Sequence, residues 1–364
     1  MADPLFSAEP SAPRRPGRWW RRRLVLYPLY IAYLLGLVWL GFKIFLRIQY
    51  GVSVVAPTAA VSLEDFYYPE LRKTGALDVA ATDDERLDVL LLGGSVLEQV
   101  GPELQRVLET RCSRPVQVYN VARSAHTSRD SLLKWRFLKG RRFDVVVIYH
   151  GINDIRMNCV APGLFREDYT HCAWYAGFES RRAAGTVNLP AILTQTASRA
   201  AERIGLGEPE AADLAFGSEI RTPGPFRQNL AEIVAGVREQ QGVVVLCSFA
   251  SFLPENYTRD AFRSHELGYG SGVYELPVEA WGLPDNVSRT LDAHNRQIRE
   301  LAVAAAGPDL RFLDLAREFP ADGEHFSDVC HLTADGTRFW VQMVLPAIPD
   351  CFDGAGISGR GTSE

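Results

Sequence analysis

Short β-branched runs alternate with stretches of helical periodicity from about residue 86 onward, and this alternation limits the fold more than any other feature. Apolar runs separated by helical patterns are typical of a parallel sheet that helices cover on both faces. The five expected strands span residues 88–92, 116–121, 144–149, 243–249 and 311–315.

The segments between and after these runs predict the helices, and Thr333 is placed to cap the last of them. Five strands with crossover helices predict a three-layer, doubly wound (flavodoxin-like) α/β domain over residues 86–350. Two long insertions, 160–225 and 252–286, follow the third and fourth strands, where insertions usually shape a binding site. The expected helices span residues 96–111, 128–138, 226–240, 287–306 and 334–345.

The N-terminal part of the chain has the pattern of a membrane anchor. Six arginines between residues 14 and 23 precede the apolar run 24–46, which as a helix can cross a hydrocarbon core of about 30 Å. A buried core helix would not be apolar on all sides behind an arginine cluster. A cleaved signal peptide would be shorter and would end at a small-x-small site, whereas Ala56, Ala59 and Ala60 lie ten or more residues beyond the run. We therefore expect an uncleaved transmembrane anchor.

Charge sets the expected orientation of this anchor. Arginines precede the span and only Lys43 and Arg47 stand at its far end, which predicts a cytoplasmic N-terminus. Residues 1–60 carry a net charge of +6 and the remainder −11, so the domain is not expected to bind nucleic acid. The expected order is a basic cytoplasmic tail (1–23), an anchor (24–46), a stalk (47–85), an extracytoplasmic (periplasmic or extracellular) domain (86–350) and a disordered tail (351–364).

The six cysteines are compatible with a compartment in which disulfides form. Cys159 and Cys172 flank a short segment and are the pair that we expect first, whereas Cys247, in an apolar run, is expected to be a buried thiol. No Cys-x-x-Cys motif occurs, which leaves a zinc knuckle or a thioredoxin-type redox site without support.

Polar motifs follow the ends of three expected strands and precede the last helix. They are Gly-Gly-Ser at 93–95, Asn-Val-Ala-Arg-Ser-Ala-His-Thr at 120–127, His-Gly-Ile-Asn-Asp at 150–154 and Ser-Asp-Val-Cys-His-Leu at 327–332. The carboxyl ends of parallel strands share one edge of the sheet, where open α/β sheets bind their ligands. A serine, an asparagine and an Asp-x-x-His pair are therefore expected to converge on one rim.

Other interpretations of these motifs have less support. No Gly-Lys-Ser/Thr follows the first motif, which excludes a P-loop, and Gly-x-Ser-x-Gly, the elbow of α/β-hydrolases, does not occur. Asn153 and Asp154 as a lone pair would be turn-capping residues. His325, Asp328 and His331 are spaced three apart and could bind zinc, but they lie in a loop, where no helical face aligns them. We assign no metal and no cofactor.

The four blocks, in this order, resemble those of the SGNH-hydrolase superfamily (GDSL esterases and lipases), and the resemblance covers residues 86–350. It implies Ser95 as nucleophile, His331 as base and Asp328 as the acid that orients this base. It also implies an oxyanion hole formed by the Ser95 and Ala125 backbone N–H groups and the Asn153 amide. These roles agree with the chemistry, because a serine hydroxyl needs a base and a forming oxyanion needs donors already in place.

Three positions depart from the pattern of that family. Gly94 replaces the aspartate of Gly-Asp-Ser, which is not a catalytic residue there. In the second block, Ala122 and Ala125 replace two glycines, and the second of these glycines donates an N–H to the oxyanion. Because a Cβ disfavours positive φ, we expect Ala125 to alter the geometry of the hole.

The sequence thus predicts a membrane-anchored, extracytoplasmic serine esterase that removes an acyl group, such as acetyl, from a small molecule, a glycan or a lipid. Gly151 and His126, beside the site, are assigned to substrate binding, although packing explains His126 equally well. An acyltransferase that passes the acyl group to a glycan hydroxyl would use the same residues. A third interpretation is a catalytically silent domain that binds a partner in envelope biogenesis; the alanines support it, and the retention of all four polar site residues speaks against it.

Overall fold

The structure is a computed structural model and describes residues 18–50, 61–78, 85–188, 191–192, 194 and 211–349. The chain divides into two units, Met1–Ala59 and Ala60–Glu364, and each is described by itself. The tail expected at 351–364 and residues 1–17 of the expected basic tail lie outside the described residues.

The second unit is built on a sheet of five parallel strands in the order β3-β2-β4-β6-β7. Val89 of β2 is aligned with Val118 of β3 on one side and with Val145 of β4 on the other. The fold class and the five strands predicted from the sequence are confirmed, since this order is that of a flavodoxin-like, doubly wound sheet. The strands are β2 (Leu87–Gly93), β3 (Val116–Asn120), β4 (Val145–Tyr149), β6 (Val243–Cys247) and β7 (Leu310–Leu313).

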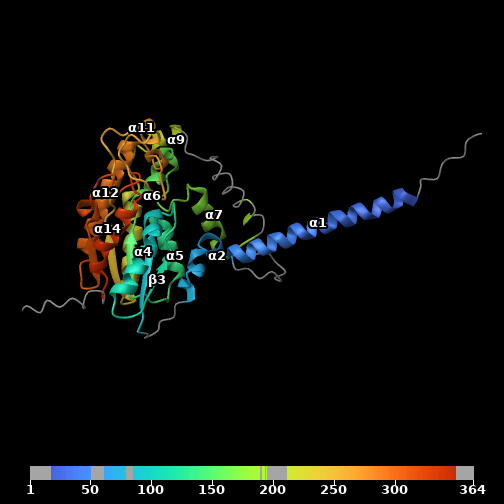
Figure 1. The fold of residues 1–364 in the computed structure, drawn as a ribbon, viewed down its shortest axis with the longest axis horizontal. Helices are drawn as coiled ribbons and strands as arrows, with labels where there is room; N and C mark the ends of the chain where they lie inside the picture. The colour runs from blue at the N-terminus through green and yellow to red at the C-terminus, as the bar shows by residue number, and fades with distance from the viewer. Residues whose placement is uncertain are drawn as a thin grey trace, which may run out of the picture. The chain divides into compact units, whose positions relative to one another are not determined.

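Helices cover both faces of this sheet (Figure 1). Helix α4 (Ser95–Arg111) packs with α14 (Ala334–Val344), and α10 (Pro223–Glu239) packs between α5 (Ser128–Phe137) and α12 (Pro284–Ala304). The side chain of Thr333 accepts a hydrogen bond from the Gly336 N–H and so caps α14, as its position predicts.

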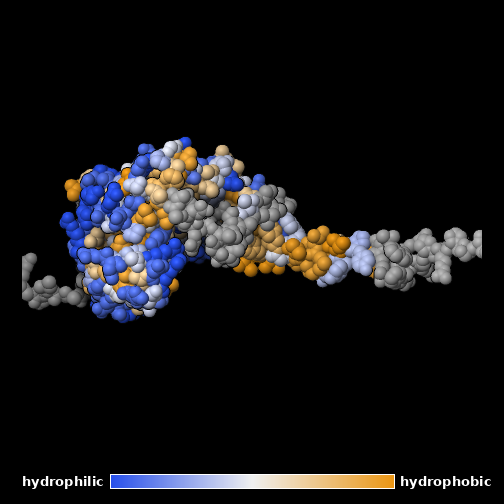
Figure 2. Space-filling model, turned by 90° about the horizontal axis from the view of Figure 1, so that it is seen from above, coloured by the Kyte–Doolittle hydropathy of each residue, from blue (hydrophilic) through white to orange (hydrophobic). Residues whose placement is uncertain are grey.

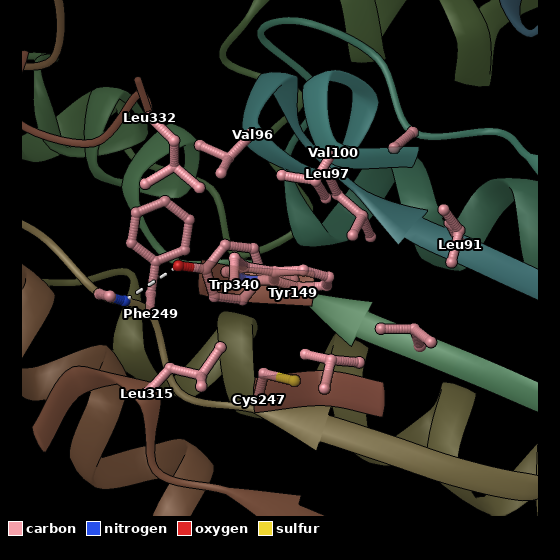
Figure 3. Close-up of a cluster of buried hydrophobic side chains, with 14 of the residues drawn as sticks. Leu91, Val96, Leu97, Val100, Tyr149, Cys247, Phe249, Leu315, Leu332 and Trp340 are labelled. Carbon is pink, nitrogen blue, oxygen red and sulfur yellow. Dashed lines mark hydrogen bonds between the residues drawn. The ribbon is translucent and has the colours of Figure 1, made fainter. Parts of the chain in front are cut away.

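In the core near the carboxyl ends of the strands, aliphatic side chains surround Tyr149, Phe249 and Trp340 (Figure 3). The Tyr149 ring stacks on Phe249 at a centroid distance of 4.6 Å and meets Trp340 edge-on at 5.5 Å. The Tyr149 hydroxyl accepts a hydrogen bond from the Ala250 N–H at 3.1 Å. These contacts fix the last residue of β4, and with it the polar motif that follows.

Helix α1 (Arg18–Tyr50) contains a segment, Val25–Ile48, that is long and apolar enough to cross a membrane or to act as a signal sequence. Its mean hydropathy is 2.0, and most of its side chains are exposed. Figure 2 shows the hydrophobic surface along this helix.

Residues 61–78, which the sequence suggested as part of a stalk, fold into the second unit. β1 (Val61–Ser62) pairs antiparallel with β5 (Thr186–Val187). Two short helices follow, α2 (Leu63–Tyr67) and α3 (Glu70–Lys73), and Phe66, Tyr68 and Leu71 are buried. Burial of these large side chains explains why the segment packs rather than extends.

The remaining elements belong mainly to the two insertions and the loops at the strand ends. Asp154, in α6, joins this region to α5 and to the loop before α7, because its carboxylate accepts hydrogen bonds from the Ser128 N–H, the Ser128 hydroxyl and the Tyr169 hydroxyl. Burial raises the pKa of Asp154 to about 7. The remaining elements of the fold are η1 (Ala76–Asp78), α6 (Ile152–Ile155), η2 (Arg156–Asn158), η3 (Pro162–Leu164), α7 (Ala173–Arg182), α9 (Ala211–Phe216), α11 (Arg259–Arg263), η4 (Val278–Ala280), α13 (Leu315–Glu318) and η5 (Leu345–Ala347).

The cysteines differ in part from the expectation. Cys159 and Cys172 are both thiols and not the expected disulfide. Cys159 Sγ lies 3.5 Å from the Trp281 carbonyl oxygen, and Cys172 is the N-cap of α7. Cys247 is a buried thiol, as predicted, and burial raises its pKa. Cys112 takes part in a disulfide.

Candidate active site

Ser95 stands where the first strand of the domain turns into its first helix. β2 ends at Gly93, Gly94 is the N-cap, and Ser95 is the first residue of α4. Its N–H therefore belongs to the first turn, whose N–H groups have no intrahelical acceptor, and it lies at the positive end of the helix dipole. The Ser95 Oγ lies 2.7 Å from His331 Nε2.

Asp328 fixes the other side of the histidine ring. His331 Nδ1 lies 2.6 Å from Asp328 Oδ2. The same carboxylate accepts the backbone N–H groups of Leu276, Cys330 and His331, at 2.8 to 2.9 Å. A carboxylate held by three N–H groups has a fixed orientation, so it places the imidazole proton on Nδ1 and leaves Nε2 as the acceptor facing Ser95.

Asn153, in α6, is oriented by two contacts. Its Nδ2 donates to the His126 carbonyl oxygen at 2.9 Å, and its Oδ1 accepts the Trp281 indole N–H at 3.0 Å. An indole N–H can only donate, so Trp281 settles which end of the amide is the oxygen. The second hydrogen on Nδ2 is not used by these two contacts.

The glycine at position 94 has a steric reason. A Cβ built there would lie 2.5 Å from Asn153 Nδ2. A side chain at this position would push the Asn153 amide aside on this backbone.

Ala125 adopts a backbone conformation that suits glycine better, with φ of 65°. It is exposed, and its N–H has no hydrogen-bond acceptor among the described residues. This is the conformation that a glycine would adopt, and the alanine carries the strain.

Two aromatic side chains from the second insertion lie against His331. The Tyr274 ring stacks on the imidazole at a centroid distance of 4.6 Å, and its hydroxyl lies 3.0 Å from the Ser124 Oγ. Trp281 lies on the imidazole at 6.0 Å. As a result Ser95 is 5% and His331 1% exposed. Neither aromatic was a candidate from the sequence, because the insertion has no regular pattern.

With this geometry in view, the sequence matches the family model of the GDSL-like lipase/acylhydrolase family over residues 91–339. The chain belongs to this family. Membership makes the protein a serine-type ester hydrolase, as the sequence predicted. A search of curated proteins finds no match.

Among solved structures, the chain is similar to three hydrolases at low identity. A GDSL-like lipase from Bacteroides thetaiotaomicron is 15% identical, with a TM-score of 0.42 over 77% of this chain and 96% of that chain. A lipase/acylhydrolase from Enterococcus faecalis is 13% identical, with a TM-score of 0.36 over 71% and 93%. An acetylxylan esterase from Geobacillus stearothermophilus is 12% identical, with a TM-score of 0.42 over 74% and 95%.

The two residues assigned to substrate binding lie next to the site and are tightly packed. The His126 ring faces Glu70, with Nδ1 3.8 Å from its Oε1, and burial and Lys134 lower the pKa of His126 well below its usual range. Gly151 is buried, and a Cβ there would lie 2.6 Å from the Phe249 side chain. Gly151 nevertheless lines the same small pocket as Ser95 and Asn153, so the assignment of Gly151 and His126 to substrate binding stays a prediction.

The residues that lie close enough together to bind zinc are not the three that the sequence suggested. His325 pairs with Asp322 at 2.7 Å, whereas Asp328, Cys330 and His331 have side-chain ligand atoms within 4.8 Å of one another. Both ring nitrogens of His331 are occupied by Ser95 and Asp328, and burial, with Asp328 nearby, raises the pKa of Cys330. A neutral thiol and an occupied imidazole are poor zinc ligands.

Chelators are therefore expected to leave ester turnover unchanged. The measurement is the initial rate with a short-chain p-nitrophenyl ester before and after incubation with 1,10-phenanthroline. Loss of activity with recovery on added zinc would instead indicate a metal-activated water.

Replacing Ala125 with glycine is expected to stabilise the protein by roughly 0.5–1 kcal/mol, because relief of the left-handed strain exceeds the entropy cost of glycine. The measurement is the free energy of unfolding in urea. Ala122→Gly is the matched control: Ala122 is buried with no positive φ, so this variant should be less stable than the wild type. Equal losses in both variants would show that the Ala125 backbone is not strained.

Proposed function

We propose that the domain hydrolyses carboxylic esters, such as acetyl esters, with Ser95 as nucleophile, His331 as general base and Asp328 as the residue that orients the base. One observation carries the proposal: the 2.7 Å contact from Ser95 to His331 Nε2 continues into the 2.6 Å contact from Nδ1 to Asp328. A buried chain of this kind is what activation of a serine hydroxyl requires.

The reaction follows from this geometry in two halves. Ser95 Oγ attacks the ester carbonyl carbon while its proton passes to His331 Nε2. The N–H groups of Ser95 and Ala125 and the Asn153 amide stabilise the oxyanion, and collapse releases the alcohol with the proton from His331, leaving an acyl-serine. Water then attacks the acyl-serine with the same proton transfers, which frees the acid and restores Ser95.

Transfer of the acyl group to a glycan hydroxyl is the second candidate. The specific observation in its favour is that Tyr274 and Trp281 lie over the reacting side chains, which limits the access of water to an acyl-enzyme. The test is the partition of product in the presence of acetylated and free oligosaccharides: free acetate supports the esterase, and a newly acetylated acceptor supports the transferase. If neither a short-chain ester nor an acetylated glycan or lipid turns over, the silent binding domain gains support.

We further propose that the domain is extracytoplasmic and anchored by the helix around Val25–Ile48. The arginine excess before this segment supports a cytoplasmic N-terminus. A reporter that needs export, fused after residue 350 of the full chain, is expected to be active, and the protein should stay in the membrane fraction. Activity of a cytoplasm-only reporter would reverse the topology, and release of a soluble domain cut near Ala60 would indicate a signal peptide.

A further inference from the structure

A buried ion pair contacts the loop of residues 121–127, which carries one of the proposed oxyanion donors, the Ala125 N–H. Glu70, in α3, and Lys134, in α5, are 6% and 0% exposed. Glu70 Oε1 lies 2.8 Å from Lys134 Nζ. Burial alone would raise the pKa of Glu70, but the Lys134 ammonium, with His126, holds it below its usual value, so the carboxylate is charged.

Lys134 connects this pair to the beginning of the loop. Its Nζ donates to the Val121 carbonyl oxygen at 2.5 Å, and Val121 is the first residue after β3. The loop then runs through Ala125, which has positive φ, to Thr127, the N-cap of α5. An ammonium that holds this carbonyl therefore sets where the loop departs from the sheet.

His126 connects the pair to the end of the loop. Its ring Nδ1 lies 3.8 Å from Glu70 Oε1 and has no hydrogen-bond partner among the described residues. Its backbone carbonyl accepts the Asn153 amide at 2.9 Å. Displacement of Glu70 would free space next to the His126 ring, and the ring would shift. The backbone carbonyl of His126, which orients Asn153, would then move with the ring.

Tyr68 closes the same cluster from the segment before Glu70. Its ring centroid lies 5.6 Å from Lys134 Nζ and 5.8 Å from the His126 ring, which it meets edge-on. Its hydroxyl donates to Asp130 in α5 at 3.0 Å. Residues 61–78 thus supply side chains that pack against the loop.

We propose that Glu70 is a positioning residue for the oxyanion hole: through Lys134 and His126 it holds the Ala125 N–H and the Asn153 amide in place. The inference rests on the proposed function, because it takes these two groups as the oxyanion donors. It makes residues 61–78 part of the catalytic apparatus, although the family match begins only at residue 91.

The physical basis is the cost of a misplaced donor. An oxyanion donor acts only when it already stands at the position of the developing charge, and small displacements lower the rate strongly. Ala125 has a strained backbone conformation. Such a conformation persists only while the surrounding contacts hold it in place. Loss of the Glu70 carboxylate removes one of these surroundings and leaves a buried ammonium unpaired.

The test uses the full-length chain in detergent and measures kcat and KM for p-nitrophenyl acetate together with Tm. Glu70→Gln and Lys134→Met each leave one partner of the pair, and the double variant removes both charges at similar volume, so its Tm should recover toward the wild type. We expect kcat to fall about 10- to 100-fold in all three variants, with KM little changed. Glu70→Asp, which keeps the charge on a shorter side chain, should recover part of kcat.

The control is the exposed Arg136–Glu232 ion pair, which joins α5 to α10. Arg136→Met with Glu232→Gln should leave kcat unchanged. Wild-type kcat in the double variant of Glu70 and Lys134, whether or not Glu70→Gln folds, would overturn the inference, because the pair would then contribute stability alone. Ser95→Ala, measured in parallel, separates the two proposals: activity retained there refutes the proposed function, whereas its loss together with full activity of Glu70→Gln refutes only the role of Glu70.

Discussion

Ser95→Ala is expected to lower kcat by roughly 10⁴- to 10⁶-fold, because among the described residues only the Ser95 hydroxyl lies against His331 Nε2 to form the acyl-enzyme. His331→Ala should lose a similar amount, and the double variant little more, since residues that act as a unit are not additive. Asp328→Asn should lower kcat less, because a histidine in the wrong tautomer can still change in part to the productive tautomer. The measurement is kcat for a short-chain p-nitrophenyl ester.

The control for this series is Ser180→Ala. Ser180 is an exposed serine in α7 whose hydroxyl bonds the Gly177 carbonyl oxygen, so its loss should not affect turnover. Losses that simply multiply in the double variant would contradict a shared Ser95–His331 unit.

Asn153→Ala is expected to lower kcat by about 10²- to 10³-fold with KM nearly unchanged, as for a donor that acts mainly in the transition state. Asn153→Asp should lose at least as much, because it puts a negative charge beside the forming oxyanion while keeping the shape of the side chain. The measurement is the separate determination of kcat and KM. A rise in KM at constant kcat would mean that Asn153 binds the substrate rather than the transition state.

The sheet could be predicted from the sequence because its three central strands are buried on both faces. The three central strands, β2, β4 and β6, are nearly continuous apolar runs, so each was found within one or two residues of its end. Once the strands are parallel, their carboxyl ends must share an edge. This is why Ser95, Asn153 and His331, far apart in the chain, could be expected on one rim.

The aromatic surroundings of the site could not be predicted in this way. Trp281 contacts Asn153 across 128 residues of sequence, and Tyr274 lies in an insertion without strand or helix periodicity. Neither a propensity nor a spacing links such positions. Only the fold brings them together.

Residues 61–78 were missed for a related reason. Their strand has two residues, and their α-helices have four and five, which is too short for any periodic signal. The buried aromatics of this segment are the one sequence feature that could have suggested packing. A polar residue such as Glu70 could not be distinguished from a solvated stalk residue until its contact with Lys134 was seen.

The most direct test of the central claim is to locate the adduct of a fluorophosphonate probe on the full-length chain by peptide mass spectrometry. We expect one modified residue, Ser95, with labelling strongly slowed in His331→Ala and in Asn153→Ala. Ester turnover with no adduct on Ser95, or with the adduct on another serine, would contradict the proposed site.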